Sequence, residues 1–291
     1  MKPGQESRTA VLVCMGRAIA HLATSEARFS DPTALALLPR DARAFVERFR
    51  QGATPQGMGA RLRHAYHARQ SQVMVVRTVA IDDAVRAALS PQLVILGAGL
   101  DGRSWRMPEL RDTVVFEVDH PDSQREKRKR VASLGKAARE IRFVPLDLAH
   151  GSLEDDLALA GHDPSVPTTW IWEGVVMYLT PAQVSASLTA IARRSAPLSR
   201  LSVLYHRPTL LLGAVGMFVR RLGEPLRSAF PPEAMRLLLS EHGFRVLEDR
   251  SIAEIGSAMT PDVGRATAFA RHMRLAIAER LPLPGAKSCR P

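Results

Sequence analysis

An α/β fold is expected for this chain, with a mostly parallel β-sheet covered by helices on both faces. From about residue 91 onward, short apolar or β-branched runs alternate with helical stretches, a pattern typical of parallel sheets. The first of these runs ends in a glycine-rich turn, as in sheets that bind nucleotides. The chain has 291 residues and is 46% hydrophobic, enough to bury the core of one large or two modest domains.

Short runs bounded by turn residues are predicted as strands, and the amphipathic stretches between them as helices. The predicted strands are 92–96, 113–118, 141–145, 168–172, 200–205 and 244–249. The predicted helices are 120–134, 152–160, 181–195 and 231–242, with a final helix within 262–280.

The organisation predicted from these patterns is a helical part followed by a ligand-binding domain. Residues 1–90 are expected to form an N-terminal cap or lid, because apolar positions recur there every three or four residues. Residues 91–284 would form the second domain, with an insertion at 207–230. Nothing in the pattern separates a monomer from a homodimer.

The chain is basic, with a formal charge of +11 and an isoelectric point near 10.7. A basic balance suits an anionic substrate or nucleic acid. The dense run Arg125–Arg130 is interpreted as a solvated helix face, with a phosphate-binding patch as the alternative. Aromatic residues make up 5% of the chain, which argues against a base-stacking surface. We therefore do not expect nucleic acid as a binding partner, although RNA as a substrate stays open.

The two cysteines and the apolar segments favour the cytoplasm. Cys14 and Cys289 stand in no zinc or disulfide spacing, so no metal is predicted and a reducing compartment fits. The apolar stretches 10–16 and 210–219 are too short to span a bilayer.

The turn after the first predicted strand reads Gly97-Ala98-Gly99-Leu100-Asp101-Gly102. Taken literally, this is the G-x-G-x-x-G of dinucleotide-binding enzymes, in which glycines let the backbone approach a ligand at a helix N-terminus. However, Asp101, Arg103 and Ser104 make the start of the following helix polar, whereas the dinucleotide fingerprint packs an apolar helix on the strand. We therefore favour another nucleotide-like ligand and keep an NAD(P)-dependent oxidoreductase as an alternative.

Acids end the next two predicted strands. Glu117 and Asp119 follow Gly97 by 20 and 22 positions, where a carboxylate can bind both ribose hydroxyls. Alternation places both acids on one side of the strand, and Asp119 is nearer the carboxyl end. Asp147 and Leu148 end the third strand, where an acid can accept from an adenine amino group and a leucine can pack on the ring. Helix N-capping is the structural alternative for Asp119 and Asp147.

Four stretches occur in an order that resembles the leucine carboxyl methyltransferase family, and more closely its bacterial S-adenosylmethionine-dependent branch. They are "LGAGLDGRSWRM", "FEVDHP", "PLDL" and "WEGVVMYL". "RFSDPTALALL", "RTVAIDD" and "RRLGEPLRSAFPPE" add to the resemblance, which covers residues 15 to 250. Gly102 departs from the family, which usually has threonine or serine there.

The resemblance implies a class I methyltransferase fold: a Rossmann-like, mostly parallel seven-stranded sheet with a helical N-terminal cap. It implies S-adenosylmethionine as the cofactor of the 91–284 domain. Carried over residue by residue, Arg77 would meet the cofactor carboxylate and Glu173 its amino group. Gly97 and Gly99 would lie against the methionine part, and Asp119 against the ribose. Asp147 and Leu148 would frame the adenine. For Arg77 the structural alternative is an ion pair with Asp82 or Asp83.

The acceptor is expected past the fourth and fifth strands, beneath the cap. Tyr178, Tyr205 and His206 are the predicted positioning or catalytic side chains, with Arg207 beside them. Arg220, Arg221 and Arg227 could attract an anionic acceptor, and the apolar stretch 210–219 could form a pocket wall. The predicted activity is S-adenosylmethionine-dependent O-methylation of a carboxylate or hydroxyl of a small, natural-product-like molecule that is anionic or apolar. A carboxylate needs no general base at neutral pH, whereas a hydroxyl would want one.

Overall fold

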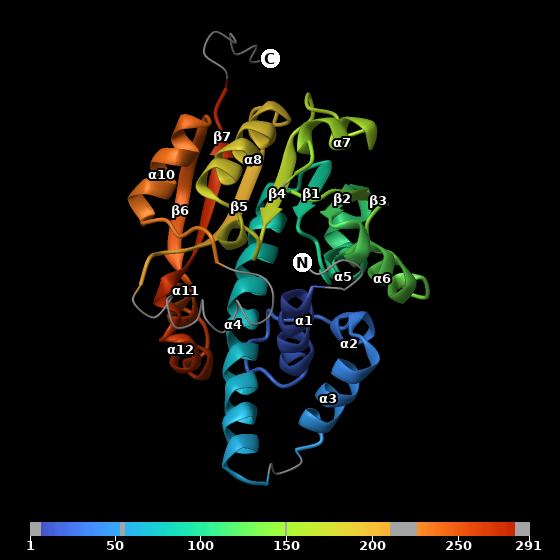
Figure 1. Cartoon of the computed structure of the whole chain (residues 1–291), viewed down its shortest axis with the longest axis vertical. Helices are drawn as coiled ribbons and strands as arrows, with labels where there is room; N and C mark the ends of the chain where they lie inside the picture. Colours follow the sequence, from blue (N-terminus) through green and yellow to red (C-terminus); the bar gives the residue numbers. More distant parts are fainter. Residues whose placement is uncertain (1–6, 53–55, 149, 210–225, 283–291) are drawn as a thin grey trace.

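The computed structural model describes residues 7–52, 56–148, 150–209 and 226–282, and it contains a seven-stranded sheet (Figure 1). The strand order is β3-β2-β1-β4-β5-β7-β6. β7 is antiparallel to both of its neighbours, and the other pairings are parallel. The predicted α/β class is therefore confirmed. The strands are β1 (Gln92–Leu96), β2 (Val114–Asp119), β3 (Glu140–Pro145), β4 (Thr168–Trp172), β5 (Arg200–His206), β6 (Phe244–Ser251) and β7 (Met273–Arg280).

The prediction of one final helix over residues 262–280 is wrong. The structure has α12 (Pro261–Thr267), a 3-10 turn η3 (Ala270–His272) and then β7. Locally, the leucine, alanines, arginines and glutamate of β7 are good helix formers. Pairing along both edges of the strand, with β5 and β6, overrides that preference. This segment supplies the seventh strand of the sheet.

Alternation along β1 divides the core into two layers. Leu93 and Ile95 belong to a cluster with the buried half of α4 (Met58–Ala88), which includes Val76 and Val79. Val94 and Leu96 point to the opposite face and join a second cluster. Leucines of α7 (Leu153–Leu159), α8 (Pro181–Arg193) and α10 (Pro232–Glu241) belong to it. The sheet is thus buried on both faces, as its parallel strands require.

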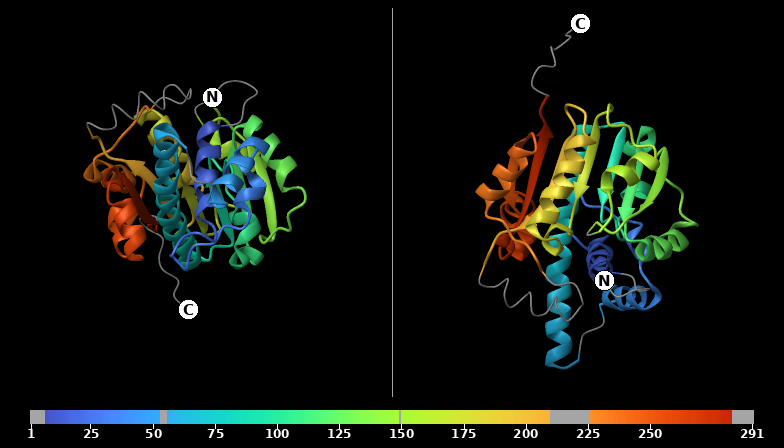
Figure 2. Two further views of the ribbon diagram at one scale, coloured as in Figure 1. Left: turned by 90° about the horizontal axis from the view of Figure 1, so that it is seen from below. Right: turned by 45° about the horizontal axis from the view of Figure 1, so that its top comes forward.

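Helices on both faces and at one end of the sheet complete the described chain (Figure 2). Thr180 and Gln183 form a capping box that starts α8 at Pro181. The remaining elements are α1 (Arg8–Ala20), α2 (Ala34–Leu37), α3 (Arg40–Arg50), α5 (Arg103–Arg106), η1 (Pro108–Asp112), α6 (Pro121–Val131), α7 (Leu153–Leu159), η2 (Val176–Tyr178), α8 (Pro181–Arg193), α10 (Pro232–Glu241) and α11 (Ile252–Ser257).

The N-terminal helices α1, α2 and α3 gather at one end of the sheet, beside the protruding half of α4 (Figures 1 and 2). Their buried side chains form a third cluster with Leu100 of the glycine turn and Trp105 of α5. The N-terminal helices therefore pack directly on the turn that follows β1. Over the described residues, no helix has the length and apolarity needed to cross a membrane.

The basic run 125–130 forms most of α6. Lys127 is buried, and its Nζ lies 2.7 Å from Glu117 Oε2. Arg125 and Lys129 instead form ion pairs at the helix surface with Asp122 and Glu126, each one turn earlier on α6. Arg125 and Lys129 are thus paired within the helix, Arg128 lies over the Phe143 ring, and Lys127 is buried in the core.

Candidate functional site

A cavity of about 410 Å³ lies at the carboxyl ends of β1, β2 and β4, the edge at which open parallel sheets bind ligands. Its wall combines one side of α1, Arg77 of α4 and the loops that follow four strands. Every residue to which the sequence assigned a cofactor role lies in this wall: Arg77, Gly97, Gly99, Asp119, Asp147, Leu148 and Glu173.

The turn after β1 needs glycine at two positions. Gly97 has φ of 65° and Gly99 has φ of 45°, a left-handed conformation that other residues adopt at a cost. A Cβ atom at Gly97 would lie 2.2 Å from Val175 Cγ2, and one at Gly99 would lie 3.0 Å from Ala10 Cβ. The turn is therefore wedged between the loop after β4 and helix α1, with its backbone facing the cavity.

Asp119 is at the cavity and Glu117 is not. Asp119 accepts hydrogen bonds from the backbone N–H of Gly99 and, over 2.6 Å, from that of His120. Burial raises the pKa of the Asp119 carboxyl, and these two donors lower it in part. Glu117 is fully buried against Lys127 and Ser104. His120, rather than Asp119, caps the N-terminus of α6.

Asp147 and Leu148 lie where the chain leaves β3. Asp147 is exposed, and its Oδ2 lies 3.0 Å from His150 Nδ1. Leu148 packs against the core cluster on that face of the sheet. Ser152 caps α7 by accepting from Asp155 N–H, so Asp147 does not serve as that cap.

Arg77 of α4 and Glu173, directly after β4, form a buried ion pair in the cavity wall. Arg77 Nη2 lies 2.9 Å from Glu173 Oε1, and Arg77 Nε donates to the same oxygen over 3.0 Å. Burial would raise the pKa of Glu173, but Arg77, Arg103 and Arg17 together lower it below its ordinary value. Asp82 and Asp83 pair with other arginines.

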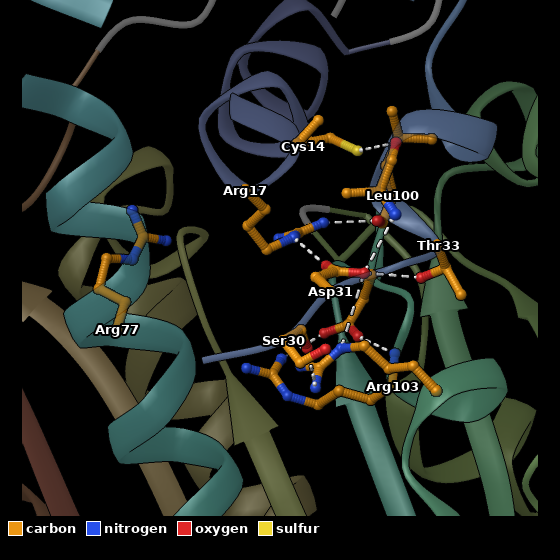
Figure 3. A network of polar contacts seen from close by, with 12 residues as sticks. Cys14, Arg17, Ser30, Asp31, Thr33, Arg77, Leu100 and Arg103 are labelled. Atoms are coloured by element: carbon orange, nitrogen blue, oxygen red, sulfur yellow. Dashed lines mark hydrogen bonds and ion pairs between the residues drawn. The ribbon is translucent and has the colours of Figure 1, made fainter. Parts of the chain in front are cut away.

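Sequence reasoning missed a buried network of arginines and acids behind this pair (Figure 3). Arg17 of α1, which also lines the cavity, lies 2.9 Å from Asp31 Oδ2 and donates to Leu100 O over 2.6 Å. Arg103 of α5 bonds three acids, among them Glu173. The polar residues Asp101, Arg103 and Ser104 on either side of Gly102 are the signal of this network in the sequence.

The residues predicted to position the acceptor do not lie together. Tyr178 lines the cavity, and its hydroxyl lies 3.4 Å from Thr9 Oγ1 of α1. Tyr205 lies outside the cavity wall, and its buried hydroxyl donates to Asp249 Oδ2 over 2.8 Å. His206 is also buried outside the wall, where burial, His272 and Arg77 lower its pKa to about 3.

Of the other predicted acceptor features, the structure describes Arg207 and Arg227. Arg227 lines the cavity beside Met177 and Tyr178. Arg207 lies at the end of β5, where its N–H donates to His272 O. Arg220, Arg221 and the apolar stretch 210–219 lie outside the described residues. Where the structure describes the chain, no three or more His, Cys, Asp or Glu side chains group as metal ligands would.

Solved structures share this fold at low sequence identity. A putative methyltransferase from Thermobifida fusca YX matches with a TM-score of 0.57 and 15% identity, over 97% of each chain. A DUF574 family protein from Streptomyces avermitilis matches with a TM-score of 0.59 and 10% identity, over 94% of this chain and 98% of that one. The seven-stranded sheet with one antiparallel strand is a class I methyltransferase fold.

Relatives in sequence are named putative S-adenosyl-L-methionine-dependent methyltransferases. One from Mycobacterium sp. (strain JLS) is 37% identical over 204 residues, 68% of this chain and 65% of the relative. One from Mycolicibacterium gilvum (strain PYR-GCK) is 35% identical over 223 residues, 75% of this chain and 71% of the relative. The match to the Mycobacterium sp. (strain JLS) protein thus spans slightly less than two thirds of its length. The family model for leucine carboxyl methyltransferase matches residues 10–192. This chain belongs to the leucine carboxyl methyltransferase family.

Proposed function

We propose that this protein transfers a methyl group from S-adenosylmethionine to a carboxylate oxygen of a small anionic acceptor. Family membership and the class I methyltransferase sheet make S-adenosylmethionine the methyl donor. One observation carries the acceptor class: the wall of the cavity continues from the cofactor residues to Met177, Tyr178 and Arg227. Among the described residues, this part of the wall has an arginine and no histidine.

The residues in the wall suit this cofactor. The glycine turn lets a ligand approach the backbone, and Asp119 can take two ribose hydroxyls in charge-assisted hydrogen bonds. Arg77 and Glu173 provide a cation and an anion side by side, which matches the carboxylate and ammonium of an amino acid end. When bound, S-adenosylmethionine supplies a sulfonium-activated methyl group, and the protein holds and desolvates the partners.

Arg227 is held at the cavity by its own backbone. Its N–H donates to Met177 O over 2.7 Å, and the neighbouring Ser228 hydroxyl donates to Val176 O over 2.9 Å. Arg17 and Arg77, the other arginines in the wall, both have carboxylate partners. Within the described residues, the Arg227 guanidinium has no acidic partner. It is therefore available to bind an anionic acceptor.

A carboxylate acceptor fits this wall better than a hydroxyl. A carboxylate is ionised at neutral pH and needs only to be held in line, whereas a hydroxyl wants a base. The two histidines in the wall, His120 and His150, lie beside Asp119 and Asp147, on the side assigned to ribose and adenine. The buried His206 and Tyr205 lie outside the wall.

A matched acceptor panel tests the proposal. The protein is incubated with methyl-labelled S-adenosylmethionine and with sets of carboxylic acids, alcohols and amines that share one carbon skeleton. Labelled methanol released by mild base identifies a methyl ester and thereby excludes an ether. We expect esters from some of the acids, and an Arg227→Gln variant with a raised KM for them. Methylation confined to alcohols would overturn the carboxylate proposal.

Two controls address the alternatives. NADH binding without S-adenosylmethionine binding would favour an oxidoreductase, which the family match does not favour. Transfer of the labelled methyl group to RNA would show that RNA, and not a small molecule, is the acceptor. We also propose that the protein works in the cytoplasm, since Cys14 is a buried free thiol and a reducing compartment would keep it so.

A further inference from the structure

Arg103, the first residue of α5, has a buried guanidinium that pairs with three carboxylates. Its side chain is 2% exposed. Nε lies 2.7 Å from Asp82 Oδ1, and Nη1 bonds Asp101 Oδ2 and lies 3.2 Å from Glu173 Oε2. The backbone N–H of Arg103 also donates to Asp101 Oδ1 over 2.8 Å. One side chain thus links α4, the glycine turn and the residue after β4.

We propose that Arg103 is a positioning residue for the amino acid end of the cofactor and that it acts through Glu173. The inference rests on the proposed function, in which Glu173 meets the cofactor ammonium. Arg103 does not line the cavity, whereas Glu173 does. Arg103 therefore contributes by fixing the carboxylate that touches the ligand.

The two carboxylate oxygens of Glu173 bind two different arginines, and this explains why Arg103 is needed beside Arg77. Glu173 Oε1 binds Arg77, and Oε2 binds Arg103. A bound amino acid end brings a carboxylate to Arg77 and an ammonium to Oε1, so the Arg77–Glu173 pair gives way to two ligand contacts. Arg103 keeps its hold on Oε2, and Glu173 stays ionised and directed at the ammonium.

Only a guanidinium suits this position. Its planar fork reaches three separate acids, whereas a lysine is a point charge on a flexible stem. The far end of the link is also fixed, because Arg106 binds both oxygens of Asp82, at 2.7 and 2.9 Å. Burial opposes the charge on Arg103, but Asp101, Asp82 and Glu173 raise its pKa well above the ordinary value. Arg103 is therefore charged wherever the protein is folded.

Two ligands separate positioning from general stability. S-adenosylhomocysteine has the amino acid end, and 5′-methylthioadenosine has the same adenosine and thioether without it. Affinity for both is measured by calorimetry on the full chain. We expect Arg103→Lys to weaken S-adenosylhomocysteine tenfold or more, as loss of a charge-assisted contact implies, and to leave 5′-methylthioadenosine within about twofold. The matched control is Lys127→Gln, which removes a cation as buried as Arg103 that pairs with Glu117 and not with Glu173 or Asp82. It should change both affinities alike.

A double variant tests whether the effect passes through Glu173. If it does, Arg103→Lys adds little to Glu173→Gln, and the double variant binds S-adenosylhomocysteine about as weakly as Glu173→Gln alone. Equal losses for both ligands, or additive losses in the double variant, would overturn the proposal. If Arg103→Lys does not fold, Asp82→Asn is used instead, because it removes an ion-pair partner of Arg103 that lies outside the cavity wall. It should weaken binding of S-adenosylhomocysteine and not of 5′-methylthioadenosine. Equal losses of affinity for the two ligands would again contradict the proposal. Wild-type protein that binds neither ligand would instead refute the cofactor site itself.

Discussion

Asp119 accepts a hydrogen bond from the backbone N–H of Gly99, so the acid that ends β2 holds the glycine turn that follows β1. The same carboxylate faces the cavity. Asp119→Asn keeps an oxygen that can accept from Gly99, but it loses the charge that would bind two ribose hydroxyls. We expect a tenfold or greater loss of S-adenosylhomocysteine affinity by calorimetry. The thermal midpoint should fall modestly, because the amide has one oxygen and leaves the N–H of His120 without its acceptor.

Glu117→Gln is the matched control, two residues earlier on the same strand. It leaves Lys127 without its buried carboxylate partner, so stability should fall while cofactor affinity of the folded protein stays close to wild type. An Asp119→Asn variant that binds as tightly as wild type would remove Asp119 from the cofactor site.

Gly97→Ala tests whether the turn after β1 needs glycine at this position. The new Cβ would meet Val175 Cγ2 at 2.2 Å, on a backbone with φ of 65°. We expect about 1–3 kcal/mol of destabilisation from the clash and the strain, together with weaker cofactor binding, measured by denaturant unfolding and calorimetry.

Gly97→Ala combined with Val175→Ala should recover the part of the stability that is due to the clash. Gly135→Ala, where the added carbon meets nothing within 4 Å, should be close to neutral. Equal effects of the substitution at Gly97 and Gly135 would show that the turn does not need glycine.

The ion pair between Arg17 and Asp31 joins α1 to the segment before α2. Both side chains are buried, with Arg17 Nε 2.9 Å from Asp31 Oδ2. Asp31→Asn leaves a buried guanidinium without its counter-ion, and we expect a loss of about 3–5 kcal/mol in the free energy of unfolding. Asp262→Asn removes an exposed pair with Arg265 and should change stability by less than about 1 kcal/mol. Similar effects of the two substitutions would mean that the Arg17–Asp31 pair is solvated.

Because the His206 side chain is buried, we expect the stability of the protein to depend on pH. Burial, His272 and Arg77 lower its pKa from 6.5 to about 3. Below pH 6.5 the unfolded chain therefore binds a proton at His206 that the folded chain does not bind. The free energy of unfolding falls as the pH drops from 6.5 towards 3. At pH 5 this one group costs up to about 2 kcal/mol relative to pH 7.5.

His206→Gln should reduce the loss of stability between pH 7.5 and pH 5, measured by urea unfolding at both values. His162, with its pKa lowered to about 4 by burial and Arg194, accounts for part of the remaining loss. An unchanged slope in His206→Gln would show that His206 is protonated in the folded protein.

The sequence predicted well those features that depend on local pattern. Strands β1 to β6 fall within a few residues of the predicted runs, because apolar alternation and the turns that bound it are local. The acids that follow parallel strands converge on one edge by topology alone. This convergence brings Asp119, Asp147 and Glu173 into one wall.

Features that depend on distant partners could not be predicted in this way. The β7 residues favour a helix locally and become a strand because β5 and β6 leave a place between them. The buried arginines bind partners that are far away along the chain. Arg17 donates to the backbone carbonyl oxygen of Leu100, 83 positions away, and Arg77 donates to the carboxylate of Glu173, 96 positions away. Tyr205 ends a strand near the site, yet Asp249 of β6 binds its hydroxyl. No local pattern in the sequence shows these partners.

The position of β7 between β5 and β6 affects how the chain can fold during synthesis. The ribosome makes β5 and β6 before residues 273–280, so β5 keeps an open edge and β6 lacks its sheet neighbour until those residues emerge. The pairing of β5 with β7 spans about seventy positions of chain, and such long-range pairing forms slowly. A nascent chain that stalls before residue 273 would present an unpaired strand edge, the surface on which chaperones act and from which aggregation starts.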